Sequence, residues 1–176
     1  IRLLEKKGGK SDYTDSFKKG LKAAVIVCSD SISAGKKEDK AGKAIIARLQ
    51  PLAVEVTHYE IIPDEVETIR SLVTQRCDEG NHLVIVTGGT GLSPRDNTPE
   101  AIRPLLEREI PGMMEARRFG QDRTPYSMLS RGVAGMRGAS LVLALPGSTR
   151  GAEETMDALF PAALHVFRIT EGARHD

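Results

Sequence analysis

Continuously apolar runs alternate with amphipathic runs along the chain from about residue 21 onward. The apolar runs at 23–29, 82–87 and 139–145 are short, and the first is rich in β-branched residues, which is typical of strands that are covered on both faces of a sheet. A further strand is expected over 54–62. Because amphipathic segments separate the runs, the pattern predicts an α/β three-layer sandwich in which helices flank a mostly parallel sheet.

The segment after the second predicted strand carries helix signals. Asp64 can cap a helix whose apolar stripe falls at positions 66, 69 and 73, and Glu67 lies three residues on, where it would complete a capping box. Gly80 is expected to end this helix.

Further helices are predicted towards the C-terminus. Thr98 followed by Pro99 indicates a helix that reaches about residue 107, and Thr124 with its following proline repeats the signal. A last helix is expected over 151–170, interrupted at Pro161.

Composition and charge indicate the domain organisation and exclude some classes of partner. We interpret residues 1–20 as a polar linker and 21–176 as one domain. The 25 basic and 24 acidic residues nearly cancel, which argues against nucleic acid or an acidic membrane surface as a partner. No apolar run approaches the ~20 residues of a membrane helix. The two cysteines are far apart and belong to no zinc-type cluster, so a reduced, cytoplasmic compartment is expected.

Three polar segments follow the predicted strands directly. In an open α/β sheet, ligands bind beyond the carboxyl ends of the strands. The site is therefore expected where these segments meet, and they comprise Ser29 with Asp30, residues 87–96, and Pro146 with Gly147 and Ser148.

The middle segment has the composition of an anion-binding loop. Its glycines allow successive backbone N–H groups to face a phosphate, and Thr87 and Thr90 add hydroxyl donors. Arg95 can neutralise phosphate charge, and Asp96 can hold a divalent cation shared with the phosphates. A turn that only reverses the chain is equally compatible with this spacing. The segment is neither a P-loop nor a GxGxxG motif.

The run from 87 to 101, TGGTGLSPRDNTPEA, closely resembles the signature of the molybdopterin adenylyltransferase family, which includes bacterial MogA and MoaB proteins and the G domain of gephyrin. The resemblance extends over about 21–170, through the residues after the first strand, IPDE at 62–65, MLSRG at 128–132 and LPG at 145–147. It implies an enzyme that joins AMP from Mg-ATP to the phosphate of molybdopterin, on an α/β fold that assembles as a homotrimer or a multiple of one.

The same resemblance implies roles for individual residues. Asp64 and Asp96 would be the catalytic carboxylates and would hold Mg²⁺, without any covalent protein nucleophile. The nucleotide would be bound by Ser29, Asp30, Thr87, Gly88, Gly89, Thr90, Gly91 and Arg95. Molybdopterin would be bound by Ser130, Arg131, Pro146, Gly147 and Ser148.

Plainer interpretations stay open beside these roles. Asp64 could act only as a helix cap and Asp96 only as a turn residue. Ser29 and Asp30 could be ordinary polar residues of a loop or a helix cap. Ser130 and Arg131 can simply finish a helix. Two other functions stay open. Enzymes that insert molybdate or recycle pyridine nucleotides share the implied fold. The non-enzymatic alternative is a catalytically silent domain that binds molybdopterin or scaffolds partner enzymes.

A second resemblance concerns residues 1–11, IRLLEKKGGKS, which are similar to the C-terminal end of cyclic pyranopterin monophosphate synthases (MoaC). It implies that a MoaC-like domain is fused ahead of this one, with Lys10 matching an active-site lysine of that family. An ordinary lysine-bearing linker is the other interpretation.

Overall fold

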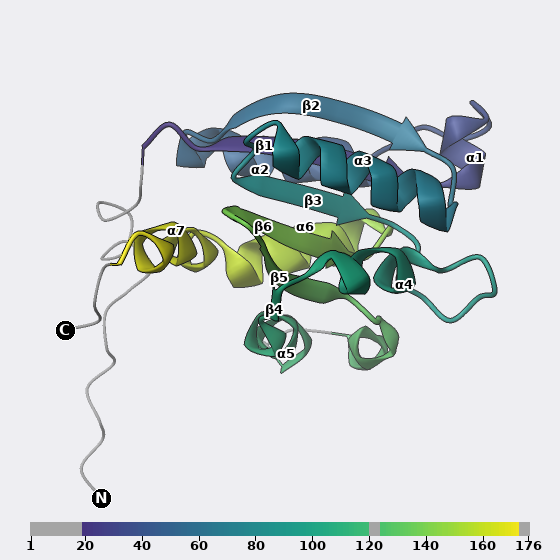
Figure 1. Ribbon diagram of the computed structural model, residues 1–176. Helices are drawn as coiled ribbons and strands as arrows, with labels where there is room; N and C mark the ends of the chain where they lie inside the picture. The colour runs from purple at the N-terminus through teal and green to yellow at the C-terminus, as the bar shows by residue number, and fades with distance from the viewer. Residues whose placement is uncertain (1–18, 120–123, 173–176) are drawn as a thin grey trace, which may run out of the picture.

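The computed structural model describes residues 19–119 and 124–172, which contain a six-stranded sheet of order β2-β1-β3-β6-β5-β4. Strands β2, β1, β3 and β6 run parallel, whereas β5 pairs antiparallel with both β6 and β4. The prediction of an α/β fold with a mostly parallel sheet is therefore confirmed (Figure 1). The strands are β1 (Lys22–Cys28), β2 (Glu55–Ile62), β3 (Leu83–Thr87), β4 (Arg108–Glu109), β5 (Val133–Arg137) and β6 (Ser140–Leu145).

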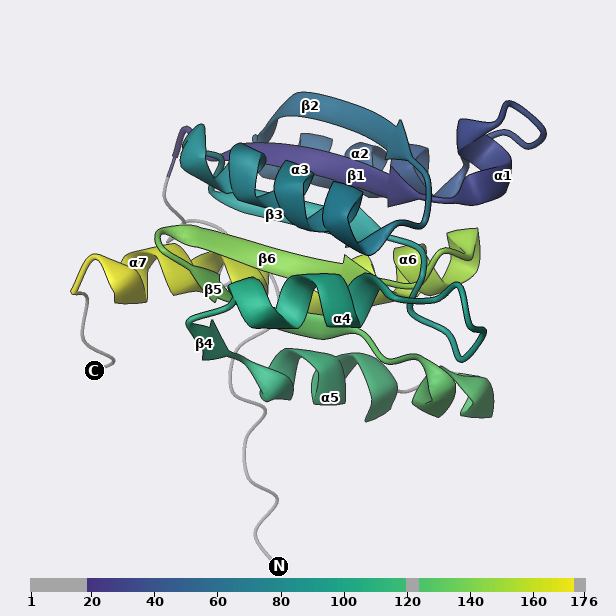
Figure 2. The same ribbon diagram turned by 45° about the vertical axis from the view of Figure 1, so that its right-hand side comes forward.

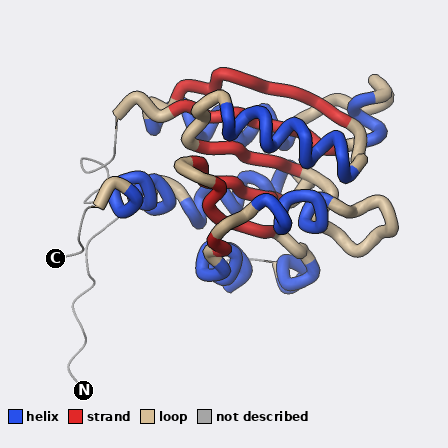
Figure 3. Tube along the Cα trace, viewed as in Figure 1, coloured by secondary structure: helices blue, strands red, loops and turns tan. Residues whose placement is uncertain are grey.

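Helices cover both faces of the sheet, as Figures 1, 2 and 3 show. On one face lie α3 (Val66–Asp78) and α4 (Thr98–Ile102), whose side chains pack with one buried cluster. On the other face lie α2 (Ala41–Leu49), α5 (Pro111–Phe119), α6 (Thr149–Leu159) and α7 (Val166–Thr170). A single turn of helix, α1 (Asp30–Ser33), follows β1 directly.

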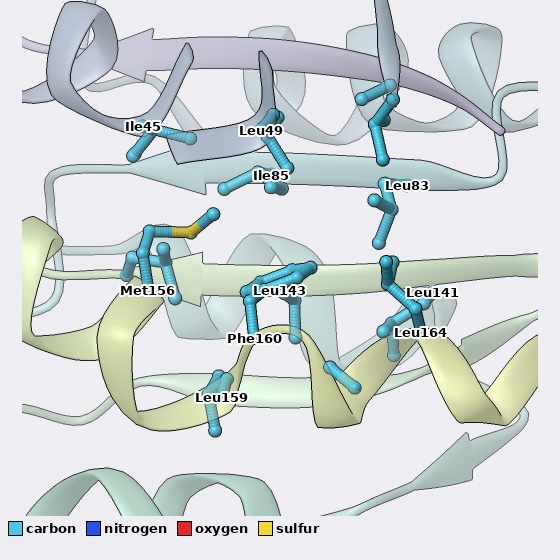
Figure 4. Close-up of a cluster of buried hydrophobic side chains, with 14 of the residues drawn as sticks. Ile45, Leu49, Leu83, Ile85, Leu141, Leu143, Met156, Leu159, Phe160 and Leu164 are labelled. Carbon is cyan, nitrogen blue, oxygen red and sulfur yellow. The ribbon is translucent and has the colours of Figure 1, made fainter. Parts of the chain in front are cut away.

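The central strands explain why the sheet is rigid. In β3, Leu83 and Ile85 point to one helical layer while Val84 and Val86 point to the other, and all four are fully buried. Figure 4 shows the first of these layers, where side chains of α2 and α6 meet those of β3 and β6. Each such side chain contributes about 1.5–3 kcal/mol when it is fully buried. The strand ends are thus held in fixed positions.

Several predicted boundaries differ from the structure. The helix that was expected to begin at Thr98 and reach 107 ends at Ile102 and continues as a 3-10 turn, Arg103–Leu105. Pro104 lacks the N–H that would continue the α-helix. The segment after Thr124 is also 3-10, Pro125–Leu129, and the predicted last helix is interrupted at Pro161 as expected.

The elements α1, α2, β4, α5 and β5 were not predicted. The predicted role of residues 1–11, including Lys10, lies outside the described residues. None of the helices in the described ranges is long and apolar enough to cross a membrane.

Candidate functional site

The four parallel strands end at one edge of the sheet, where their arrowheads point to the same side in Figures 1 and 2. Backbone hydrogen bonds join these ends, because Ser29 N donates to Ile62 O at 2.9 Å and Gly88 N donates to Leu145 O at 3.0 Å. The three polar segments that follow β1, β3 and β6 therefore meet, as the sequence predicted.

Gly88 turns the chain at the end of β3 in a position that only glycine can take. Its φ is +105°, and a Cβ there would lie 2.1 Å from the carbonyl oxygen of Cys28. Gly147 packs against it in turn, since its own Cβ would lie 3.0 Å from the Gly88 Cα. These two predicted binding residues bring β1, β3 and β6 into close contact.

The next three residues of the loop keep their amides available. No acceptor among the described residues takes the N–H of Gly89, Thr90 or Gly91. The carbonyl of Gly89 accepts from the N–H of Thr98 at 3.1 Å, and that of Thr90 accepts from Arg131 N at 2.8 Å. A loop that uses its carbonyls for the fold and leaves its N–H groups unpaired suits an anion.

The threonine hydroxyls of the loop have protein partners. Thr87 was predicted as a phosphate donor, but its buried hydroxyl donates to the Pro146 carbonyl oxygen at 2.7 Å. The hydroxyl of Thr90, which is also buried, lies 3.0 Å from that of Ser130. Burial at the strand end explains both, because a covered hydroxyl needs a protein partner.

Asp64 does not cap the helix that follows it. The N-cap of α3 is Glu65, without a side-chain cap bond, so the predicted capping box is wrong. Instead, Asp64 Oδ2 accepts from the N–H of Asp30 at 3.1 Å, while the N–H of Asp64 donates to Asp30 Oδ1 at 3.0 Å. A partner 34 residues away in the sequence has displaced the local interaction.

The two carboxylates of this pair differ in electrostatic environment. Partial burial is the largest cause that raises the pKa of Asp64 above its usual value, and the negative charges of Asp30 and Asp96 add to it. The hydrogen bond from the Asp64 N–H, together with Arg95, holds the pKa of Asp30 below its usual value.

Asp64 Oδ1 is buried and has no hydrogen-bond partner, and the same holds for the hydroxyl of Thr98. Both atoms lie over Gly89, at 3.1 Å and 2.3 Å from the position of a Cβ there. Buried oxygens without partners are uncommon in folded proteins, and they mark this point as a place for a ligand or cation.

Asp96 lies beside Gly91, the next glycine of the loop. Its Oδ2 lies 2.8 Å from where a Cβ of Gly91 would be, and it accepts from Ser93 N at 2.8 Å. The interpretation of Asp96 as a turn residue is thus confirmed. The turn also places its carboxylate beside the loop, close enough for its charge to affect Asp64.

Arg95 lies at the rim of this group. Its guanidinium donates to both carboxylate oxygens of Asp30, through Nε and Nη2 at 2.9 Å each. The side chain is 59% exposed, so this ion pair is weak and can exchange for an anion in solution.

Ser29 and Arg131 take structural contacts. Ser29 is the N-cap of α1 and accepts from Ile32 N at 3.3 Å, which confirms the plainer interpretation of that residue. The guanidinium of Arg131 donates to the carbonyls of Gly91 and Asp96 and to the carboxylate of Glu100. It contacts the loop rather than ending a helix.

A pocket of about 220 Å³ opens beside the loop, between the end of β6, α6 and the 3-10 turn Pro125–Leu129. Three of the residues predicted to bind molybdopterin line it, namely Ser130, Pro146 and Ser148. Arg117 and Arg150 also line it, together with Glu154, which pairs with Arg150 at 2.7 Å. Arg117 belongs to no predicted motif and reaches the pocket through the packing of α5 on α6, whereas Arg150 lies two residues after Ser148 in the sequence.

The chain matches the family model described as a probable molybdopterin binding domain over residues 24–165. It belongs to this family. The chain is 39% identical to the molybdopterin adenylyltransferase of Helicobacter pylori J99, over 78% of this chain and 81% of that protein. It is 38% identical to a molybdenum cofactor biosynthesis bifunctional protein of Chlorobaculum tepidum, over 99% of this chain.

Solved structures of MoaB and MogA proteins share the fold. The MoaB protein of Thermus thermophilus is 43% identical and superimposes with a TM-score of 0.77, over 84% of this chain and 96% of that one. The chain spans only 55% of the Chlorobaculum protein, 24% of the gephyrin of Dictyostelium discoideum and 59% of the bifunctional protein of Synechococcus elongatus.

Proposed function

We propose that this domain transfers an adenylyl group from Mg-ATP to molybdopterin, as a step of molybdenum cofactor biosynthesis. The names of its relatives from H. pylori and Haemophilus influenzae, 38–39% identical, support this activity. The observation that carries the proposal is the row of unpaired N–H groups at Gly89, Thr90 and Gly91, beside the buried, unpartnered Oδ1 of Asp64. Amides suit the phosphates of ATP, and carboxylate oxygen suits their cation.

The residues present fit Mg²⁺. Asp64 Oδ1 is a buried carboxylate oxygen without a hydrogen-bond partner, and Asp96 lies close enough for its charge to act on Asp64. Mg²⁺ at phosphate-transfer sites is commonly held by one or two carboxylates together with the substrate's phosphate oxygens. Asp64 and Asp96 would hold it here, and when bound it supplies positive charge that offsets the charge of the leaving pyrophosphate.

The chemistry needs positioning rather than a protein nucleophile. A phosphate oxygen of molybdopterin attacks the α-phosphorus of ATP, a new P–O–P bond forms, and the bond to the β-phosphate breaks to release pyrophosphate. The loop amides would orient the nucleotide. The pocket with Arg117, Arg150 and Ser148 would hold molybdopterin next to it, where the guanidinium groups match its phosphate.

Release of pyrophosphate from ATP, Mg²⁺ and molybdopterin tests the proposal. Asp96→Asn is expected to lower the rate by at least about hundredfold, because the charge that holds the cation is lost. Asp78→Asn is the matched control: it removes an exposed carboxylate on α3 that pairs with Arg137, away from the loop, and its rate should equal wild type. No release by the wild-type protein would contradict catalysis, and molybdopterin binding without release would favour the silent scaffold.

Assembly and cellular context belong to the same proposal. We propose a homotrimer or a multiple of one, in the cytoplasm and beside a MoaC-like unit. The exposed apolar side chains of Tyr126, Met128 and Leu129 support self-association, and the bifunctional relatives support a second domain in the same protein. Sedimentation equilibrium measures the oligomer directly. A monomer at micromolar concentration would contradict the assembly without affecting the activity.

A further inference from the structure

Arg131 contacts the glycine loop through both its backbone and its side chain. Its N–H donates to Thr90 O at 2.8 Å, its Nε donates to Gly91 O at 2.8 Å, and its Nη2 donates to Asp96 O at 2.5 Å. Arg131, just before β5, thus donates hydrogen bonds to three carbonyl oxygens of the 90–96 segment.

The guanidinium is itself held in place. Its third nitrogen, Nη1, donates to the carboxylate of Glu100 on α4. Every nitrogen of the group therefore has a protein acceptor, and the planar fork fits these acceptors in one orientation. Three of the five guanidinium N–H donors are used by the loop and by Glu100, and Arg131 does not line the neighbouring pocket, so the side chain is directed at the loop rather than at the site proposed for molybdopterin.

Fixing a carbonyl also fixes the next amide. In a trans peptide unit the C=O of one residue and the N–H of the next point in opposite directions in one plane. The bond to Thr90 O therefore directs the N–H of Gly91 away from Arg131, and the bond to Gly91 O does the same for the N–H of Leu92. In the same way, the N–H of Thr98 donates to Gly89 O, and this bond fixes the direction of the N–H of Thr90.

We propose that Arg131 is a positioning residue for the nucleotide: its backbone orients the N–H of Gly91 and its side chain orients the N–H of Leu92 towards the phosphates, and it does not contact the pterin substrate. The inference rests on the proposed function, since it assigns the loop to ATP. It replaces the expectation that Arg131 binds molybdopterin. A preorganised row of amides binds an anion more tightly than a mobile one, because less ordering accompanies binding.

Calorimetric titration of Mg-ATP into the protein without molybdopterin tests the inference. Arg131→Met removes the three side-chain bonds and keeps the backbone N–H, so the Kd for Mg-ATP should rise about tenfold. Arg131→Lys keeps the charge but can replace only part of the fork, so its Kd should lie between those of Arg131→Met and wild type. The KM for molybdopterin should stay unchanged in both.

The matched control is Arg137→Met. Arg137 lies at the far end of β5, where it pairs with Asp78 on α3. Its Kd should equal that of wild type. Thermal melting of all variants shows whether they fold, and a variant with a wild-type melt and weakened Mg-ATP binding isolates positioning from stability.

The outcomes separate the two claims. Wild-type protein that binds no Mg-ATP would remove the proposed function. Wild-type binding that is unchanged in Arg131→Met would overturn the positioning role while leaving the proposed function in place. A raised KM for molybdopterin with an unchanged Kd for Mg-ATP would also overturn it, because that result assigns Arg131 to the pterin.

Discussion

Asp30 and Asp64 each accept a hydrogen bond from the backbone N–H of the other, at 3.0 Å and 3.1 Å. This reciprocal pair joins the end of β1 to the end of β2 and keeps two carboxylates close together. Arg95 and the Asp64 N–H lower the pKa of Asp30, whereas burial and neighbouring negative charge raise that of Asp64. As pH rises, Asp30 therefore ionises first.

This order of ionisation gives a pH prediction. Asp30→Asn removes a negative charge that faces Asp64, and the Asn Oδ1 can still accept the backbone bond. The pKa of Asp64 should fall, since less repulsion opposes its ionisation. The acid limb of the pH profile of kcat/KM, measured by pyrophosphate release from about pH 4 to about pH 8, should move to lower pH. An acid limb that stays in place, or moves upward, would show that another group controls it.

Asp64 itself should reduce stability at neutral pH. Because its pKa is higher in the folded than in the unfolded state, its ionisation opposes folding above the folded pKa, and this cost disappears as pH falls towards the unfolded pKa. Asp64→Asn should therefore raise the free energy of urea unfolding at about pH 7 more than at about pH 4. Pyrophosphate release should fall by at least about hundredfold. Lower stability of this variant at neutral pH would reverse the sign of the argument.

Parts of the fold could be predicted from local patterns. The buried strands β1, β3 and β6 are covered on both faces, so their apolar runs indicate them directly. Strands β4 and β5 escaped prediction because β4 has two residues and β5 contains a glycine, and both depend on pairing with β6 or with each other. Their existence follows from tertiary contacts that no local pattern contains.

The site shows the same division. The edge of the sheet where the segments meet was predicted, since parallel strands place their carboxyl ends together. The bonds of Asp64 to Asp30 and of Arg131 to the loop span 34 and 40 residues. Local spacing therefore indicated a helix cap for Asp64, and for Arg131 it left a helix end open beside the ligand contact that the family resemblance implied. Nucleotide and pterin contacts at the predicted residues stay predictions.

Gly88 offers a test of the close packing at the strand ends. Gly88→Ala would place a Cβ 2.1 Å from the Cys28 carbonyl oxygen at a φ of +105°, so both backbone segments must move. We expect a loss of about 2–4 kcal/mol in the free energy of unfolding. The control is Gly138→Ala, where φ is +56° but no atom lies within 4 Å of the new Cβ, and where strain alone should cost about 1 kcal/mol. Equal losses in chemical denaturation would contradict a packing role for Gly88.

Thr98 was predicted only as the start of a helix, but the environment of its hydroxyl indicates a role in the site. The N-cap is Asn97, while the Thr98 side chain is fully buried and its hydroxyl has no hydrogen-bond partner. Its neighbours are Asp64, whose Oδ1 lies beside the same Cβ position of Gly89, and the thiol of Cys28, whose pKa is raised to about 12 by burial. A thiol is a weak hydrogen-bond partner, so we expect the hydroxyl to bind the cation or the substrate beside Asp64.

Two substitutions separate this role from stability. Thr98→Val has the same shape without the hydroxyl, and should leave the free energy of unfolding unchanged or raise it by up to about 1 kcal/mol, since a buried unpaired group is removed. Pyrophosphate release should nevertheless fall about tenfold. Thr98→Ser keeps the hydroxyl and loses a methyl group, so its activity should stay near wild type while its stability falls by about 1 kcal/mol. If the hydroxyl bonded only to Cys28, the valine variant would lose stability and keep its activity, which is the opposite pattern.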